Sequence, residues 1–179
     1  MSAKPEVKPY SGKFQYLDEN GRVLAEGACR LTVGPENCTV APSSGAAISF
    51  DLGDVDALAP AEHQLDLQLY TGRVVRLRQF GGTFTPLSTD VAAAWRDRTV
   101  RCLLLEDLGE VLRVNGTAAL NGGAPGKAEL RLYKSNLAVL PAAGAAFQWR
   151  LADVDCVSFD REAYAVTLAS GASRLTIGR

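Results

Sequence analysis

The fold is decided by the stretch Val40-Ala-Pro-Ser-Ser-Gly-Ala-Ala47, because a second version of it, Val139-Leu-Pro-Ala-Ala-Gly-Ala-Ala146, follows 99 residues later. An Asp-Val-Asp triplet comes after each version. At this offset residues 27–72 align with residues 126–171 without a gap and share fourteen identities in 46 positions. Chance similarity between alanine-rich stretches would not also align the Gly, Pro, Asn and alternating apolar positions. The chain therefore contains two copies of one module.

The repeated segment has the alternation that is typical of β-strands. Residues 64–70 alternate polar and apolar side chains, and their counterparts Tyr164, Val166 and Leu168 keep the same spacing. A glycine follows in both copies, Gly72 and Gly171, where a tight hairpin needs positive φ. With further turns over residues 18–21 and 34–37, the first copy is predicted to contain about seven short strands.

The predicted turn at residues 34–37 also fixes which residues of its hairpin face each other. Val33 is expected opposite Cys38, which places Cys29 near Pro42. Cys29 and Cys38 are then too far apart for a disulfide bond.

One amphipathic helix is expected between the two copies, over residues 88–107. Thr89 and Asp90 give it an acidic start, and Gly109 lies just past its end. Residues at helical spacing form an apolar face that is expected to cover a core: Val91, Trp95, Cys102 and Leu105.

Seven antiparallel strands followed by such a helix resemble the pleckstrin-homology-like (PH-like) superfold, in which the helix plugs one open end of a bent barrel. The resemblance is carried by the Val-x-Pro-x-x-Gly-Ala-Ala segment, the Asp-Val-Asp triplet, the Leu-x-Leu-x-Leu strand with its Thr-Gly turn, and Trp95. It implies a mainly β protein with two PH-like barrels of about seven antiparallel strands each. Residues 1–108 would form the first, with a C-terminal capping helix, and residues 109–179 the second, without one. A generic β-sandwich and two lipocalin-like barrels are the competing folds.

Composition and charge argue against several classes of protein. The 179 residues are 47% hydrophobic and 22% charged, as in folded soluble proteins. A formal net charge of -1 gives no overall basic footprint for coating nucleic acid or an anionic membrane. Because the sequence also shows no export signal and no long apolar run, we expect a cytoplasmic protein. Its high alanine and arginine content suggests a bacterial source.

The sequence carries no recognisable catalytic or metal-binding motif. Its one histidine, His63, is expected in an exposed loop, and no nucleotide-binding or nucleophile-elbow motif occurs. The four cysteines lack the Cys-x-x-Cys spacing and are expected to be buried free thiols: Cys29, Cys38, Cys102 and Cys156. The acidic cluster of Asp51, Asp54 and Asp56 does not fit a calcium loop, and the second copy replaces Asp51 by Arg150. We therefore predict a non-catalytic protein with no cofactor and no metal site.

Two kinds of binding remain open. PH domains bind lipid headgroups through basic residues between their first two strands, but that loop here reads Asp18-Glu-Asn-Gly21, whose carboxylates would repel phosphates. The tandem arrangement looks like the middle domains of histone chaperones and like peptide-binding scaffolds, at the level of fold only. A protein- or peptide-binding scaffold is the first hypothesis. The alternative is anion or nucleic-acid binding through an arginine-rich hairpin, with Arg73, Arg76 and Arg78, and the helix, with Arg96, Arg98 and Arg101.

The second copy stops at Arg179, where the helix of the first copy would begin. We therefore expect no helix after Ser173 and an apolar opening around Phe147, Trp149 and Leu168. A continuation of the chain, the first module or another chain, including a second copy in a homo-oligomer, would cover it. The candidate binding residues are thus Arg73, Arg76, Arg78, Phe147 and Trp149.

Overall fold

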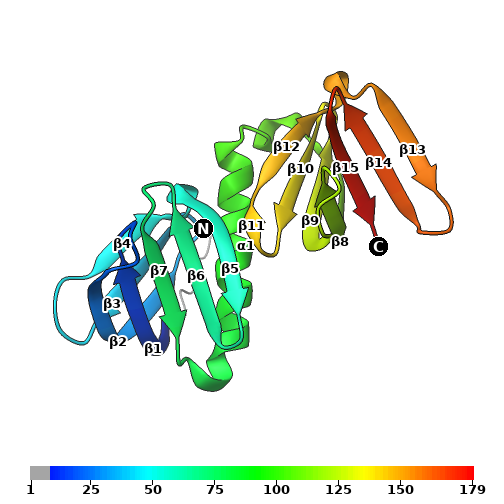
Figure 1. Ribbon diagram of the computed structural model, residues 1–179. Coiled ribbons are helices and arrows are strands. Elements are labelled where there is room, and N and C mark those ends of the chain that lie inside the picture. The colour runs from blue at the N-terminus through cyan, green and yellow to red at the C-terminus, as the bar shows by residue number, and fades with distance from the viewer. Residues whose placement is uncertain (1–8) are drawn as a thin grey trace. The chain divides into compact units, whose positions relative to one another are not determined.

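The computed structural model describes residues 9–179 and is mainly β, as the sequence predicts (Figure 1). Apart from short 3-10 turns, its one helix in this range is α1 (Phe84–Cys102). The chain divides between Thr99 and Val100 into two compact units. We call them unit 1 and unit 2 and describe each by itself.

Unit 1 holds seven antiparallel strands in the order β5-β6-β7-β1-β2-β3-β4. No ladder joins β4 to β5 among the described residues, so the sheet is an open, barrel-like structure. The strands are β1 (Pro9–Leu17), β2 (Val23–Val33), β3 (Asn37–Pro42), β4 (Ile48–Asp51), β5 (Val55–Ala61), β6 (Gln64–Leu69) and β7 (Val74–Arg78).

Unit 2 repeats this topology strand for strand, in the order β13-β14-β15-β8-β9-β10-β12. The shared order confirms the duplication that the sequence indicates. The elements are β8 (Glu110–Leu120), β9 (Gly126–Tyr133), β10 (Asn136–Pro141), the short β11 (Gly144–Ala145), β12 (Phe147–Arg150), β13 (Cys156–Asp160), β14 (Ala165–Ser170) and β15 (Ser173–Gly178).

The 99-residue offset holds in the backbone pairing of the second to fourth strands of each unit. Leu31 faces Val40 in unit 1, and Leu130 faces Val139 in unit 2. A turn glycine has φ of 104° in both units, Gly45 and Gly144.

The offset changes at the next hairpin, because the turn between β5 and β6 has Ala61 opposite Gln64, whereas the turn between β13 and β14 has Asp160 opposite Ala165 and is two residues longer. The expected gap-free match up to Gly72 and Gly171 was therefore wrong for this strand, and Tyr164 lies in the turn rather than in β14.

The hairpin register around the buried cysteines is confirmed. Cys29 faces Pro42 and Val33 faces Cys38, and both thiols are free. Cys102 and Cys156 are also free, but they are exposed, so the expectation that all four are buried was wrong for these two.

The helix boundaries differ from the prediction at both ends. Helix α1 begins at Phe84 rather than Ser88, because Pro86 lies in its first turn, where a missing N–H costs no hydrogen bond. It ends at Cys102 because Leu104 takes a left-handed conformation, with φ of 57°. Leu105 therefore lies beyond the helix, although it is buried, and Gly109 instead ends a short 3-10 helix (Glu106–Leu108).

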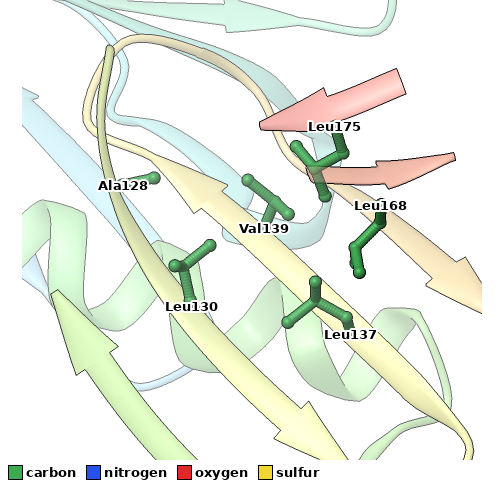
Figure 2. Packing of buried hydrophobic residues seen from close by; sticks show 6 residues of the cluster. All are labelled: Ala128, Leu130, Leu137, Val139, Leu168 and Leu175. Carbon is green, nitrogen blue, oxygen red and sulfur yellow. The ribbon is translucent and has the colours of Figure 1, made fainter. Parts of the chain in front are cut away.

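Unit 2 has two small cores on opposite faces of its sheet. The first joins residues of β9, β10, β14 and β15: Ala128, Leu130, Leu137, Val139, Leu168 and Leu175 (Figure 2). The second packs the other face of β9 and β10 against the end of α1 and the segment after it: Val100, Leu105, Tyr133, Ala138 and Leu140. Strand β10 is therefore buried on both faces.

Candidate functional site

In unit 1 the helix covers the gap between the end strands β4 and β5. The side chains of Leu87, Val91 and Trp95 are completely buried. Trp95 Nε1 donates a hydrogen bond of 2.9 Å to the carbonyl of Val55, at the start of β5. Arg98 donates two hydrogen bonds, of 2.8 and 2.9 Å, to the carboxylate of Asp51, at the end of β4. The capping helix that the sequence predicts is therefore held to both strands.

The first half of α1 is fixed by a second polar contact. The hydroxyl of Tyr10, on β1, donates a hydrogen bond to the carboxylate of Asp90. This bond, together with burial, raises the pKa of Tyr10 to about 12. Because Asp90 and Arg98 are eight residues apart in the helix, the two contacts are separated by roughly 12 Å along the helix axis.

Over the described residues, unit 2 contains no counterpart of this helix: strand β15 ends at Gly178, and residue 179 is the last one described. Leu58 of unit 1 is 1% exposed, whereas its repeat counterpart Val157 is 62% exposed. Val55 is buried, whereas its counterpart Val154 is only half-buried. Positions that are buried in unit 1 are therefore more exposed to solvent in unit 2.

The face of the unit 2 sheet that carries its first core is apolar across the whole sheet, and its outer positions are exposed. In adjacent strands Trp149 faces Leu137, Val114 faces Leu130, Ile177 faces Val166 and Val157 faces Leu168. Because side chains that face each other in register lie on the same side of a sheet, one continuous apolar face runs from β12 to β13.

Two grooves open on this face. The first has a volume of about 480 Å³ and is lined by Phe147 and Trp149 together with Leu120, Arg150 and Asp153. The second, of about 550 Å³, has an apolar lining of Val114, Leu130, Phe159, Tyr164, Val166 and Ile177.

Only some of the residues that line these two grooves were predicted from the sequence. Phe147 and Trp149, the two apolar candidates, both lie in the first groove. The second groove was not predicted, although its signal is present in the alternation of Val157 and Phe159 along β13. These two side chains are 62% and 63% exposed.

The three arginine candidates lie at unit 1, each beside an acidic or tyrosyl group. Arg76 forms a bidentate ion pair with Asp66 at 2.8 Å, and Arg78 lies 3.8 Å from Glu26. Arg73 donates to the hydroxyl of Tyr16 at 3.1 Å. The hydrogen bond to Asp66 raises the pKa of Arg76, and that to Tyr16 raises the pKa of Arg73.

The other polar candidates have local structural contacts. Asp51 accepts a hydrogen bond from the backbone N–H of Gly53, and Asp155 accepts one from that of Gly171, as expected for turn aspartates. His63 is exposed at the turn between β5 and β6. Within residues 9–179 no group of three or more His, Cys, Asp or Glu residues is placed to hold a metal ion.

Comparisons with known proteins identify no family. No protein-family model matches the sequence, and no curated protein matches it. A structure of the Spt16D Pob3N heterodimer is similar over 96% of this chain and 85% of that chain, with 15% sequence identity and a TM-score of 0.38. Over the described residues, no helix is long and apolar enough to cross a membrane.

Proposed function

We propose that this chain is a non-catalytic module that binds a protein or peptide through the open apolar face of unit 2. The observation that carries the proposal is the contrast between repeat counterparts, such as buried Leu58 and exposed Val157. Leaving large apolar side chains in water is unfavourable by about 25 cal/mol per Å². The centre of this face is buried core, but Val114, Val157 and Phe159 are exposed, and exposed apolar side chains that lie close together are characteristic of an interaction surface.

The composition of the two grooves supports a polypeptide ligand. Phe147, Trp149, Phe159 and Tyr164 provide aromatic surface, and Arg150 and Asp153 provide charges at the rim of the first groove. Aromatic side chains surrounded by polar groups are typical of protein-protein interfaces. The arginines of unit 1, by contrast, already lie beside Asp66, Glu26 and Tyr16, which weakens the case for an anion or nucleic-acid site.

Site-specific photo-cross-linking of the full chain tests the proposal. A benzophenone amino acid is placed at position 147, in the first groove, and in a control protein at Tyr70, which is 72% exposed on unit 1. The two proteins are irradiated in the cells that naturally make this chain. We expect a discrete protein adduct from position 147 that is absent from position 70. Adducts of equal yield from both positions, or from neither, would contradict the proposal.

Salt dependence separates the two binding hypotheses. When the cross-linking is repeated in a lysate of these cells, an apolar interface should give a nearly constant yield between 50 and 200 mM salt. Binding through phosphate contacts would instead weaken steeply over this range. Turnover of an ester, phosphate or nucleotide substrate by the purified chain would overturn the non-catalytic assignment.

A further inference from the structure

Two exposed cations, Lys13 on β1 and Arg30 on β2, lie on the outer face of the unit 1 sheet. The neighbouring residues Phe14 and Leu31 are buried in the core, so the alternation along each strand directs the two cations outwards. Within residues 9–179 neither cation forms an ion pair or a side-chain hydrogen bond. Both charges are therefore accessible to a ligand.

Arg78 of β7 extends this pair to a third strand. It lies directly opposite Lys13, while Arg30 lies opposite Ser11, two residues away on the same face. Of the three arginines predicted for the hairpin, Arg78 is the one with the long ion pair, 3.8 Å from Glu26, and its Nε is buried without a hydrogen-bond partner. Like charges that face each other across two strands are destabilising, so the sheet gains no stability from this arrangement. We call Lys13, Arg30 and Arg78 the cationic cluster.

Unit 2 shows that the shared topology does not require these charges. In register, Thr117 takes the place of Lys13, and Glu129 takes that of Arg30. Gly178 of β15 pairs with Thr117 and takes the third position. The same three strands pair in unit 2 without a cation at any of these positions, which indicates that the cations of unit 1 have a role other than holding the sheet together.

The cationic cluster lies on a finished part of the sheet. Strands β7, β1 and β2 follow one another in the sheet, and each has a strand on both sides (Figure 1). The side chains that face the cluster from neighbouring strands are small or uncharged: Ala28, Ala41 and Gln64. Short neighbours leave the cations open to solvent, and the Gln64 amide can both donate and accept hydrogen bonds with a peptide backbone.

We propose that the cationic cluster is a second binding surface, distinct from the face of unit 2, and that it binds an acidic segment of a partner protein. Three cations on adjacent strands span about 10 Å, because neighbouring strands are roughly 4.8 Å apart. Separate Asp or Glu side chains of one short peptide can reach all three. Complementary charge of this kind determines which partner binds and how fast it associates.

Nucleic acid fits the same surface less well. The residues that face the cluster include no aromatic side chain on which a base could stack. Glu26 and Asp66 lie on the same outer face, and their carboxylates would repel a continuous row of phosphates. An acidic peptide can place uncharged residues opposite these two carboxylates.

The test is an NMR titration of the isotopically labelled full chain at 50 mM salt. The ligand is a synthetic peptide of alternating glutamate and serine, and the control ligand has glutamine in place of glutamate. One double variant, Lys13→Gln with Arg30→Gln, removes two charges from the cluster. The matched control, Lys127→Gln with Lys134→Gln, removes two exposed charges from unit 2. Unchanged resonances of buried residues show that each variant keeps its fold.

We expect the glutamate peptide to shift resonances of β1, β2 and β7 around the cluster, and the glutamine peptide to shift none. Lys13→Gln with Arg30→Gln should weaken binding about fivefold, the combined effect of two exposed ion pairs. The control variant should weaken it less than about twofold. Binding to the unmodified chain should also weaken when the salt is raised to 200 mM, because the ion pairs are exposed.

Three results would overturn the inference: no binding of the glutamate peptide, equal binding of the glutamine peptide, or equal effects of the two double variants. Tighter binding of oligothymidylate than of the peptide at the cluster would also overturn it and assign this surface to nucleic acid. Cross-linking from position 147 reports on unit 2 alone, so the binding function proposed above stands or falls independently of these results.

Discussion

Gly12 has no side chain and therefore leaves room for the aromatic ring of Phe80, which lies just before helix α1. The ring of Phe80, which is 4% exposed, packs directly over this glycine. A Cβ atom at position 12 would lie 2.6 Å from the ring. Phe80 precedes the 3-10 turn (Gly81–Thr83) that leads into α1, so its position fixes where the helix starts.

We predict that Gly12→Ala lowers the free energy of unfolding by about 1–3 kcal/mol, because the ring of Phe80 must move. Urea denaturation measures the change. Gly82→Ala is the matched control, since a Cβ there would have no atom within 4 Å, and it should change stability by less than about 0.5 kcal/mol. Equal effects of the two substitutions would show that Phe80 does not pack on Gly12 in solution.

The cysteines provide a second prediction at the scale of residues. Burial raises the pKa of Cys29 to about 11 and that of Cys38 to about 12, whereas Cys102 and Cys156 are exposed. Because the thiolate is the reactive form, a maleimide at neutral pH should label two thiols quickly and all four only after unfolding. Mass spectrometry counts the labels, and rapid native labelling at Cys38 would contradict the buried register of β3.

The same shifts have a consequence for stability at high pH. Both folded-state pKa values lie above the usual thiol value of 9.0, so the folded chain retains these protons longer than the unfolded chain. The stabilisation is fully present below pH 9 and declines as the pH rises towards 11 and 12. Cys29 and Cys38 therefore contribute to alkaline unfolding.

At the scale of elements, the end of helix α1 is set by its backbone. The N–H of Leu105 bonds to the carbonyl of Val100, and that of Leu104 to the carbonyl of Arg101. This pair of bonds, with Leu105 packed on Val100, is a Schellman cap. Glycine usually occupies the left-handed position of such a cap, but in this chain the residue at that position is Leu104.

Leu104→Gly is therefore expected to stabilise the chain by about 1 kcal/mol, since a left-handed leucine is strained and this side chain is 83% exposed. Thermal unfolding measures the gain. Leu104→Ala keeps the strain while removing the same apolar side chain, and should give no such gain. A loss of stability with glycine would mean that the helix continues past Cys102 in solution.

A buried ion pair lies on the covered face of β9. Arg131 is 4% exposed and donates to Glu129 Oε1 at 2.6 Å. Glu129→Ala leaves the arginine charge in place and should cost about 3–5 kcal/mol of unfolding free energy. Replacing both residues, by Glu129→Leu and Arg131→Met, should recover most of this loss. Asp153→Ala, in an exposed pair, is the control and should cost about 1 kcal/mol or less.

Features that depend on nearby residues could be predicted from the sequence, whereas features that depend on tertiary packing could not. Hairpin registers such as Cys29 with Pro42 follow from alternation and turn length, which are local, and were predicted. The end of α1 was not, because Leu104 takes a conformation that leucine seldom adopts. Burial of Arg131 was not predicted either, since its position alternates like an exposed strand residue and is covered only through tertiary packing.

For the whole molecule, the repeat predicted two units of one topology, while differences between the copies identify the candidate site. Phe147 and Trp149 were predicted as candidates because the second copy was expected to have an apolar opening around them. The second groove depends on how β8 pairs with β15 and how β13 pairs with β14. These pairings cannot be derived from the 99-residue offset of the repeat. Only the folded sheet brings Val114 and Phe159 to one groove.

The central claim, that the same sheet is covered in unit 1 and open in unit 2, is tested most directly by the two tryptophans. Trp95 is fully buried beneath unit 1, and Trp149 lines the first groove of unit 2. The full chain labelled with 5-fluorotryptophan gives one fluorine resonance for each, and Trp149→Phe assigns them. We predict that the Trp149 resonance shifts between H₂O and D₂O and that the Trp95 resonance does not. Equal insensitivity of both resonances to the solvent would contradict the account.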